Sequence, residues 1–139
     1  MKSGRYNVGV GLLTMALFMA YGFLLIYLRD FAPGKEQWIA EYGIGKHFES
    51  RLAHVHGNLF ALLNVGLGFV LARIQGLDRP RTIAAVLGLF GLLMPTGILM
   101  EVYLGAPPIF VLIGAVAMTA SVALSGLLAL YGWGGERPE

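Results

Sequence analysis

The chain has 139 residues, of which 57% are hydrophobic and only 13% are charged, and its formal net charge is +2. A soluble domain has about a quarter charged residues, and a small one exposes much of its surface, so this composition excludes an ordinary soluble domain. The charges are clustered and leave four nearly uncharged runs of about 20 residues, the length of a membrane-spanning helix. The sequence therefore predicts an all-α integral membrane four-helix bundle, with one transmembrane domain over residues 1–139.

The four predicted transmembrane helices cover about residues 6–28, 52–72, 83–104 and 109–131. The first follows a basic start, but it is longer than the roughly 7 to 15 residues of a signal-peptide core and no small-residue cleavage site follows it. We therefore expect it to be retained as a helix. In the long connection that follows it, residues 31–34 predict a turn. Residues 35–42 predict a short interfacial helix that carries Trp38 at headgroup depth.

Candidate ligands for a metal or a cofactor lie at the start of the second predicted helix, where His54, His56 and Asn58 occur. The two histidines are about 200° apart on a helix and do not share a face, whereas His54 and Asn58 do. Polar side chains at membrane depth are costly, and a neutral imidazole suits haem iron. Each histidine is alternatively an interfacial residue bonded to water or headgroups. Asn64, which lies deeper, either holds a substrate oxygen or joins two helices by a hydrogen bond.

The third predicted helix contains Pro95, which should kink it, and ends near Glu101 and Tyr103. Because the second helix begins at the membrane face where the third ends, chain order brings these two residues close to His47 and His54. Glu101 either orients a histidine or transfers protons, or it is a helix end that reaches the interface. Tyr103 either bonds a polarised substrate or belongs to the aromatic belt.

The last predicted helix carries small residues at four-residue spacing, namely Ala117, Ser121 and Ser125. Small residues let helices approach closely in lipid, so this stripe predicts either packing within the chain or a contact between subunits. The short basic connection at 73–81 favours an orientation with the N-terminus and the C-terminus inside. We expect an integral protein of a bacterial inner membrane.

Three short motifs stand in and after the second predicted helix: Ala53-His54, Phe69-Val70-Leu71 and Asp78-Arg79. Together with the four spans, the size and the long first connection, they make the chain resemble styrene oxide isomerase. That resemblance implies an oligomeric membrane enzyme, with a trimer favoured, and haem b held between subunits by a histidine on the second helix. Its ferric iron is a Lewis acid that opens an epoxide to a carbonyl compound.

Carried over by position, the resemblance puts His54 in the place of the haem ligand. Phe60 stands where the family has an asparagine, and Tyr103 corresponds to the family's tyrosine only with a gap. Glu101 does not occupy the position of the family's helix 3 aspartate. His54 therefore carries most of what the resemblance implies for this chain.

The leading hypothesis is a haem-b-binding membrane protein that isomerises a small hydrophobic epoxide. Its metal ligand is His54, and its candidate residues are Tyr103, Asn64 and Glu101 for catalysis and His54, His56 and Asn58 for cofactor binding. One alternative is a non-enzymatic accessory or assembly subunit of a respiratory or photosynthetic complex. Another is a copper or zinc site made by His47, His54, His56 and Glu101. The expected partners are the lipid bilayer, a small hydrophobic substrate and further copies of the chain, with no nucleic acid.

Overall fold

The computed structural model describes residues 3–132, and within this range the chain forms six helices and no strand. The helices are α1 (Ser3–Asp30), α2 (Lys35–Ala40), α3 (Gly45–Arg73), α4 (Asp78–Gly91), α5 (Leu93–Leu104) and α6 (Ile109–Gly132). Four segments are long and apolar enough to cross a membrane: α1, α3, α4 together with α5, and α6. The predicted all-α fold with four spans is confirmed, and the apolar helices are compatible with a bilayer.

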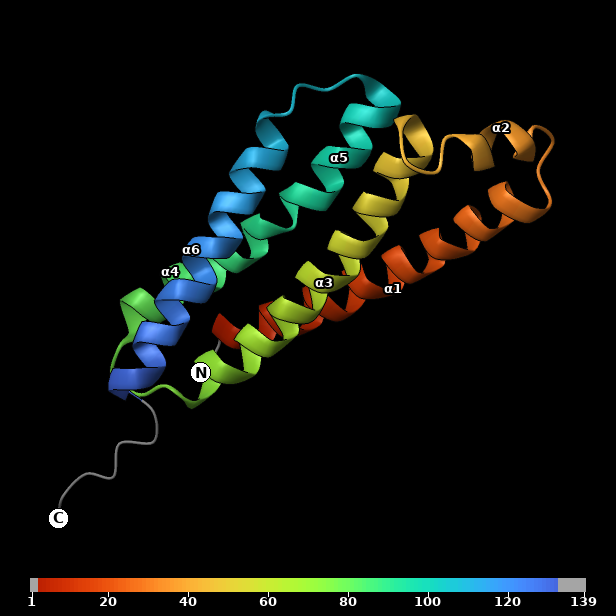
Figure 1. The fold of residues 1–139 in the computed structure, drawn as a ribbon. Coiled ribbons are helices and arrows are strands. Elements are labelled where there is room, and N and C mark those ends of the chain that lie inside the picture. The colour runs from red at the N-terminus through yellow and green to blue at the C-terminus, as the bar shows by residue number, and fades with distance from the viewer. Residues whose placement is uncertain (1–2, 133–139) are drawn as a thin grey trace, which may run out of the picture.

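The helices are arranged around α3, which lies between α1 on one side and the α4, α5 and α6 group on the other (Figure 1). α1 packs mainly against α3, and α6 packs mainly against α4 and α5. The described start of α1 and the end of α6 lie at one end of the molecule, and α2 lies at the opposite end (Figure 1). A groove between α1 and α3 opens near the end where α2 lies.

The second transmembrane helix begins earlier than the sequence predicts, at Gly45 rather than at residue 52. Its first two turns are charged, because they contain Lys46, Glu49 and Arg51. Charged residues end an uncharged run, but they do not end a helix that emerges into the interface. His47 consequently lies on α3 itself and not in a loop.

The turn at residues 31–34 and a short helix after it are both present as predicted, although α2 ends at Ala40. Gly34 stands immediately before α2 with a φ of 83°, in the left-handed region that glycine adopts without steric cost. The chain can therefore reverse direction between α1 and α2 within a few residues.

The third span is interrupted at Leu92, between α4 and α5. Pro95 causes this break because it has no N–H to donate to the carbonyl of Gly91, one turn earlier. The kink predicted from Pro95 is confirmed. Gly114 of α6 packs on the backbone at Met94, which lets α6 approach the interrupted segment closely.

A hydrogen-bonded pair of asparagines joins three helices in the interior. Asn7 of α1 donates from Nδ2 to Oδ1 of Asn64 at 2.9 Å and to the carbonyl of Ala85 at 2.8 Å. Asn64 of α3 donates to the carbonyl of Gly88 at 2.8 Å. Both asparagines are fully buried, where an unpaired amide is costly. Of the two interpretations left open for Asn64, the helix-to-helix hydrogen bond is the one present.

The small residues of α6 pack inside the chain. Ala117, Ser121 and Ser125 are all buried. Ser121 donates from Oγ to the carbonyl of Ala84 on α4 at 2.7 Å, whereas the buried Oγ of Ser125 has no partner among the described residues. The first of the two interpretations of this stripe, packing within the chain, therefore accounts for these three side chains.

The contact between α1 and α3 depends on glycine. A Cβ atom on Gly68 would lie 2.6 Å from the carbonyl oxygen of Gly4, and a Cβ on Gly11 would lie 2.8 Å from the carbonyl oxygen of Ala61. Backbones that approach this closely are typical of helix packing in lipid. Toward the α2 end the two helices diverge (Figure 1).

Candidate functional site

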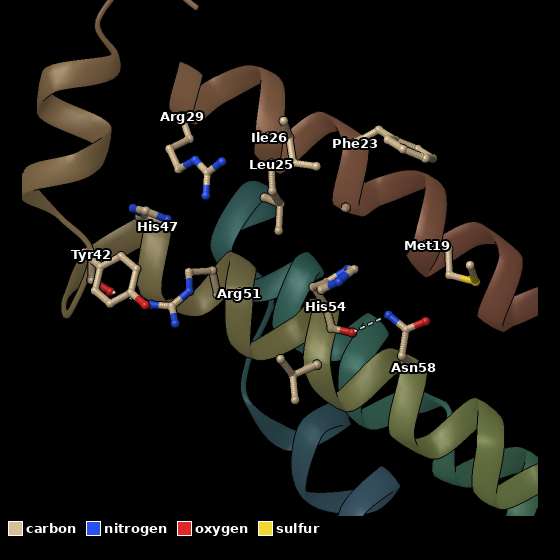
Figure 2. A pocket seen from close by; sticks show the side chains of 12 residues that line it. Met19, Phe23, Leu25, Ile26, Arg29, Tyr42, His47, Arg51, His54 and Asn58 are labelled. Carbon is tan, nitrogen blue, oxygen red and sulfur yellow. Dashed lines mark hydrogen bonds between the residues drawn. The ribbon is translucent and has the colours of Figure 1, made fainter. Parts of the chain in front are cut away.

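A groove of about 750 Å³ opens between α1 and α3 where the two helices diverge (Figure 2). Twelve residues line it: Met19, Gly22, Phe23, Leu25, Ile26, Arg29, Tyr42, His47, Arg51, His54, Val55 and Asn58. This lining contains two arginines, two histidines and no carboxylate. The walls of the groove are apolar toward the membrane interior and basic toward the membrane interface.

Four polar residues of α3 face the groove as one stripe: His47, Arg51, His54 and Asn58. Their spacings of four, three and four residues place them on one face of a helix. The sequence predicted a common face for His54 and Asn58, but it did not identify Arg51 as a site residue. The signal was present in the seven-residue interval that separates His47 from His54 and Arg51 from Asn58.

The imidazole of His54 is held by the backbone of α1. Its Nδ1 lies 2.8 Å from the carbonyl oxygen of Phe18. Because a carbonyl can only accept, Nδ1 carries the proton and Nε2 of the neutral ring keeps a free lone pair. A hydrogen bond of this kind orients a metal-binding histidine and fixes its tautomer. The ring extends from α3 into the space between the two helices (Figure 2).

Gly22 makes room for this imidazole on α1. A Cβ atom at Gly22 would lie 2.7 Å from Cε1 of His54, closer than real Cβ contacts come. Every residue other than glycine would therefore displace the ring. Gly22 and the carbonyl of Phe18 together determine where the imidazole sits.

An aromatic cluster fastens the segment around α2 to the first turns of α3. His47 stacks on Trp38 with ring centroids 4.6 Å apart and meets the ring of Tyr42 edge-on at 5.3 Å. Its Nδ1 is hydrogen-bonded to the carbonyl of Trp38. The guanidinium of Arg51 lies 3.7 Å from the centre of the Tyr42 ring, in cation–π geometry. His47 is buried in this cluster and serves to position it.

A chain of hydroxyl groups links Tyr103 to the neighbourhood of His54. The Tyr103 hydroxyl lies 2.8 Å from Oγ of Ser50 and 3.2 Å from the hydroxyl of Tyr21. The Tyr21 ring is in turn 6.4 Å from the His54 ring, centroid to centroid. Ser50 and Tyr21 were not predicted from the sequence. Tyr21 could have been identified from the sequence, because a phenol within an apolar span is a polar group that needs a partner there.

The remaining predicted site residues lie away from the groove. His56 has its Nδ1 2.9 Å from the carbonyl of Leu52 in its own helix. Glu101 lines a separate depression next to Glu49, and Asn64 belongs to the buried asparagine pair. The structure brings His54 and Asn58 together in one groove, with Tyr103 close by, and it leaves His56, Glu101 and Asn64 elsewhere.

A bare metal ion has no multidentate site in the part of the chain described. Between residues 3 and 132, no group of three or more histidines and carboxylates is placed to hold one ion. The expected copper or zinc site of His47, His54, His56 and Glu101 is therefore not assembled within one chain, because these side chains point to different surroundings. No protein-family model, curated protein or solved structure matches the chain.

Proposed function

We propose that the protein binds haem b in the groove between α1 and α3, where His54 would hold the iron. The observation that supports this is the placement of the His54 imidazole in the groove, where the Phe18 carbonyl of α1 orients it through Nδ1. His56 does not line the groove, and His47 is buried against Trp38 and Tyr42. A bare ion needs about four protein ligands, which this groove does not offer. A haem needs only an axial residue, because the macrocycle supplies its other donors.

The other residues of the groove fit a flat apolar group. Met19, Phe23 and Val55 provide apolar walls, and all three are more than half exposed in the single chain. The volume of about 750 Å³ lies within the range of roughly 300 to 1,000 Å³ that small-molecule sites occupy. Burying these side chains against a bound ring system would supply apolar contact area on one side of α1 and α3.

The reaction we propose is the isomerisation of a small hydrophobic epoxide to a carbonyl compound, for which ferric haem supplies a Lewis acid. The apolar walls keep water from the opening epoxide, which would otherwise give a diol. Asn58 donates one N–H of its Nδ2 to the carbonyl of His54, and the second N–H of that amide can donate to an epoxide oxygen in the groove. The Tyr21 ring lies 6.4 Å from the His54 ring, centroid to centroid, and its hydroxyl is 3.2 Å from that of Tyr103, so these two phenols are the nearest candidate proton donors that we propose.

The same proposal includes a homo-oligomer, with the trimer favoured, in which a neighbouring copy covers the open side of the groove. α1 supports it, because only 11% of its apolar window is buried within the chain, against 33% to 39% for the other spans. Cross-linking in native membranes followed by mass determination tests it, and a chain that remains monomeric while binding haem contradicts it.

We also propose an orientation with both termini inside, in a bacterial inner membrane. Arg73, Arg79 and Arg81 lie at the end of the molecule where α6 finishes, and the N–H of Gln75 donates to the carbonyl of Gly132 there. Basic residues in short connections favour the inner side. Cysteine labelling from outside intact cells tests this orientation, and reaction at residue 76 would contradict it.

The visible absorption spectrum of the purified full-length protein tests haem binding. We expect the shifted Soret band of ligated haem after haem addition in the wild type and in His56→Ala, because His56 does not line the groove. We expect His54→Ala to lose the shifted band of the ligated haem, and His54→Gly to recover it when imidazole is added. A wild type whose spectrum after haem addition is that of free haem, or a His54→Ala spectrum identical to the wild type, overturns the proposal.

A separate assay tests the chemistry. Haem-loaded protein in detergent is mixed with an aryl epoxide, and the aldehyde is measured against the diol. We expect aldehyde from the wild type and no aldehyde from His54→Ala. Haem binding without any conversion of epoxides would refute the isomerase half of the proposal and keep the cofactor.

A further inference from the structure

We infer that Arg29 and Arg51 form a carboxylate-binding end of the groove, which holds the acidic side chains of the tetrapyrrole at the membrane interface. This inference rests on the proposed function, because it names the part of the same ligand that each end of the groove recognises. Protoporphyrin has an apolar ring and two carboxylates on one edge, so it needs an apolar slot with a cationic end.

The first observation is the distribution of charge along the groove. Arg29 is the next-to-last residue of α1, and Arg51 is in the second turn of α3. The two helices are antiparallel, so these ends meet at the same membrane face (Figure 1). No carboxylate lines the groove itself, and Asp30, the partner of Arg29, lies outside its lining.

The second observation is that Arg51 is held in place before any ligand arrives. Its guanidinium lies over the Tyr42 ring at 3.7 Å, and Nη1 donates to the Tyr42 carbonyl at 3.1 Å. This bond uses one of the three guanidinium nitrogens, and the other two can address an acid. A planar guanidinium whose position is already restrained loses less conformational freedom when it binds a carboxylate.

The third observation is the distance of this arginine from the proposed iron ligand. Arg51 precedes His54 by three residues, which is about 4.5 Å along the helix axis, and both residues line the groove. A ligand that His54 holds near its centre would therefore extend past Arg51 toward the interface. That geometry would direct the acidic edge of the ligand outward and its apolar edges inward, toward Met19 and Val55.

Arg29 can join the same site because its present partner is weakly held. It donates to its neighbour Asp30 at 3.0 and 2.8 Å, and both side chains are substantially exposed. An exposed ion pair contributes about 0 to 1 kcal/mol, so a ligand carboxylate at the mouth of the groove can replace Asp30. In Figure 2 the Arg29 side chain extends from α1 toward α3.

The experiment compares iron protoporphyrin IX with its dimethyl ester, which has the same ring and iron but no acids. Both are titrated into the detergent-purified full-length protein, and the dissociation constant is taken from the Soret change. We expect the wild type to bind the free acid at least about tenfold more tightly than the ester, the scale of a hydrogen bond to a charged group. We expect Arg51→Gln and Arg29→Gln to lose most of this preference.

Control variants separate this inference from the haem proposal. Arg79→Gln, at the other end of the molecule and exposed, should keep the wild-type preference. Arg51→Lys should keep part of it, because the charge remains and the planar fork is lost. The Soret position should not change in any arginine variant, since His54 still ligates. Equal affinity for acid and ester in the wild type overturns the carboxylate site alone, whereas binding of neither compound overturns the haem proposal.

Discussion

Replacing Gly22 by alanine tests whether α1 positions the imidazole of His54. The new Cβ would lie 2.7 Å from Cε1 of His54, whereas ordinary contact begins at 3.4 Å. The ring has to withdraw by several tenths of an ångström. The imidazole is the part that can move, because a shift of α1 would disturb its close backbone contacts with α3 at Gly4 and Gly11. This withdrawal breaks or lengthens the 2.8 Å bond from Nδ1 to the Phe18 carbonyl.

The size of the effect follows from that hydrogen bond. A single hydrogen bond contributes about 0.5 to 1.5 kcal/mol, and loss of the group that orients a metal ligand typically costs 10- to 100-fold in affinity. We therefore expect Gly22→Ala to bind haem about tenfold more weakly than the wild type. The Soret band of the saturated variant should still show histidine ligation, because His54 is present.

Gly9→Ala is the matched control, because it lies on the same helix and its added Cβ would meet no atom within 4 Å. Both substitutions raise helix propensity by about 1 kcal/mol, so a general effect on α1 is the same in both. The assay is a haem titration in detergent, with thermal unfolding measured on the same samples. If Gly22→Ala binds haem as tightly as Gly9→Ala, the Phe18 carbonyl and Gly22 do not position His54.

Three further predictions concern the free energy of unfolding, measured by denaturation of the detergent-solubilised protein. Asn64→Leu removes two interhelical hydrogen bonds, each of which contributes about 0.6 and at most about 1.7 kcal/mol in membranes. We expect the free energy of unfolding to fall by about 1 to 3 kcal/mol. An unchanged stability would show that the buried asparagine pair contributes nothing. Gly68→Ala should lower the free energy of unfolding by about 1 to 3 kcal/mol, because the added methyl group overpacks the contact between α1 and α3. Gly66→Ala is the control, because its Cβ meets open space and should leave stability unchanged. Equal effects of the two substitutions would refute the close-contact argument. Ser121→Ala should lower the free energy of unfolding by about 0.6 kcal/mol or more. Ser125→Ala removes an unpaired buried hydroxyl and should leave stability unchanged or raise it. If Ser125→Ala were the more destabilising of the two, the hydrogen-bond assignment would be wrong.

The spans could be predicted from the sequence because membrane insertion is decided by local composition. Four runs of about 20 residues without charges are enough to predict four helices. The interruption of the third span was predictable for the same reason, since Pro95 lacks the N–H that a continuous helix needs. The start of α3 at Gly45 was not, because helix propagation into the charged interface depends on the tertiary support that Trp38 and Tyr42 give to His47 and Arg51.

The membrane face of the candidate site was also predictable, but the members of the groove were not. Chain order alone brings the start of one span and the end of another to the same side, which placed His54 and Tyr103 near each other. The order of the helices along the chain does not determine which neighbouring helix a given side chain faces. That His56 bonds within its own helix and Glu101 lines another depression depends on how α3 is rotated about its axis.

The sequence by itself determined that this chain is helical, spans a bilayer four times and carries an imidazole near one face, because each of these follows from composition and spacing along a single segment. Only the tertiary structure decided which imidazole lies between α1 and α3 in the groove, since that depends on a carbonyl and a missing Cβ that a different helix provides. The rotation of α3 against α1 is decided by the close contacts of Gly4, Gly11 and Gly68, which involve pairs of residues far apart in the chain.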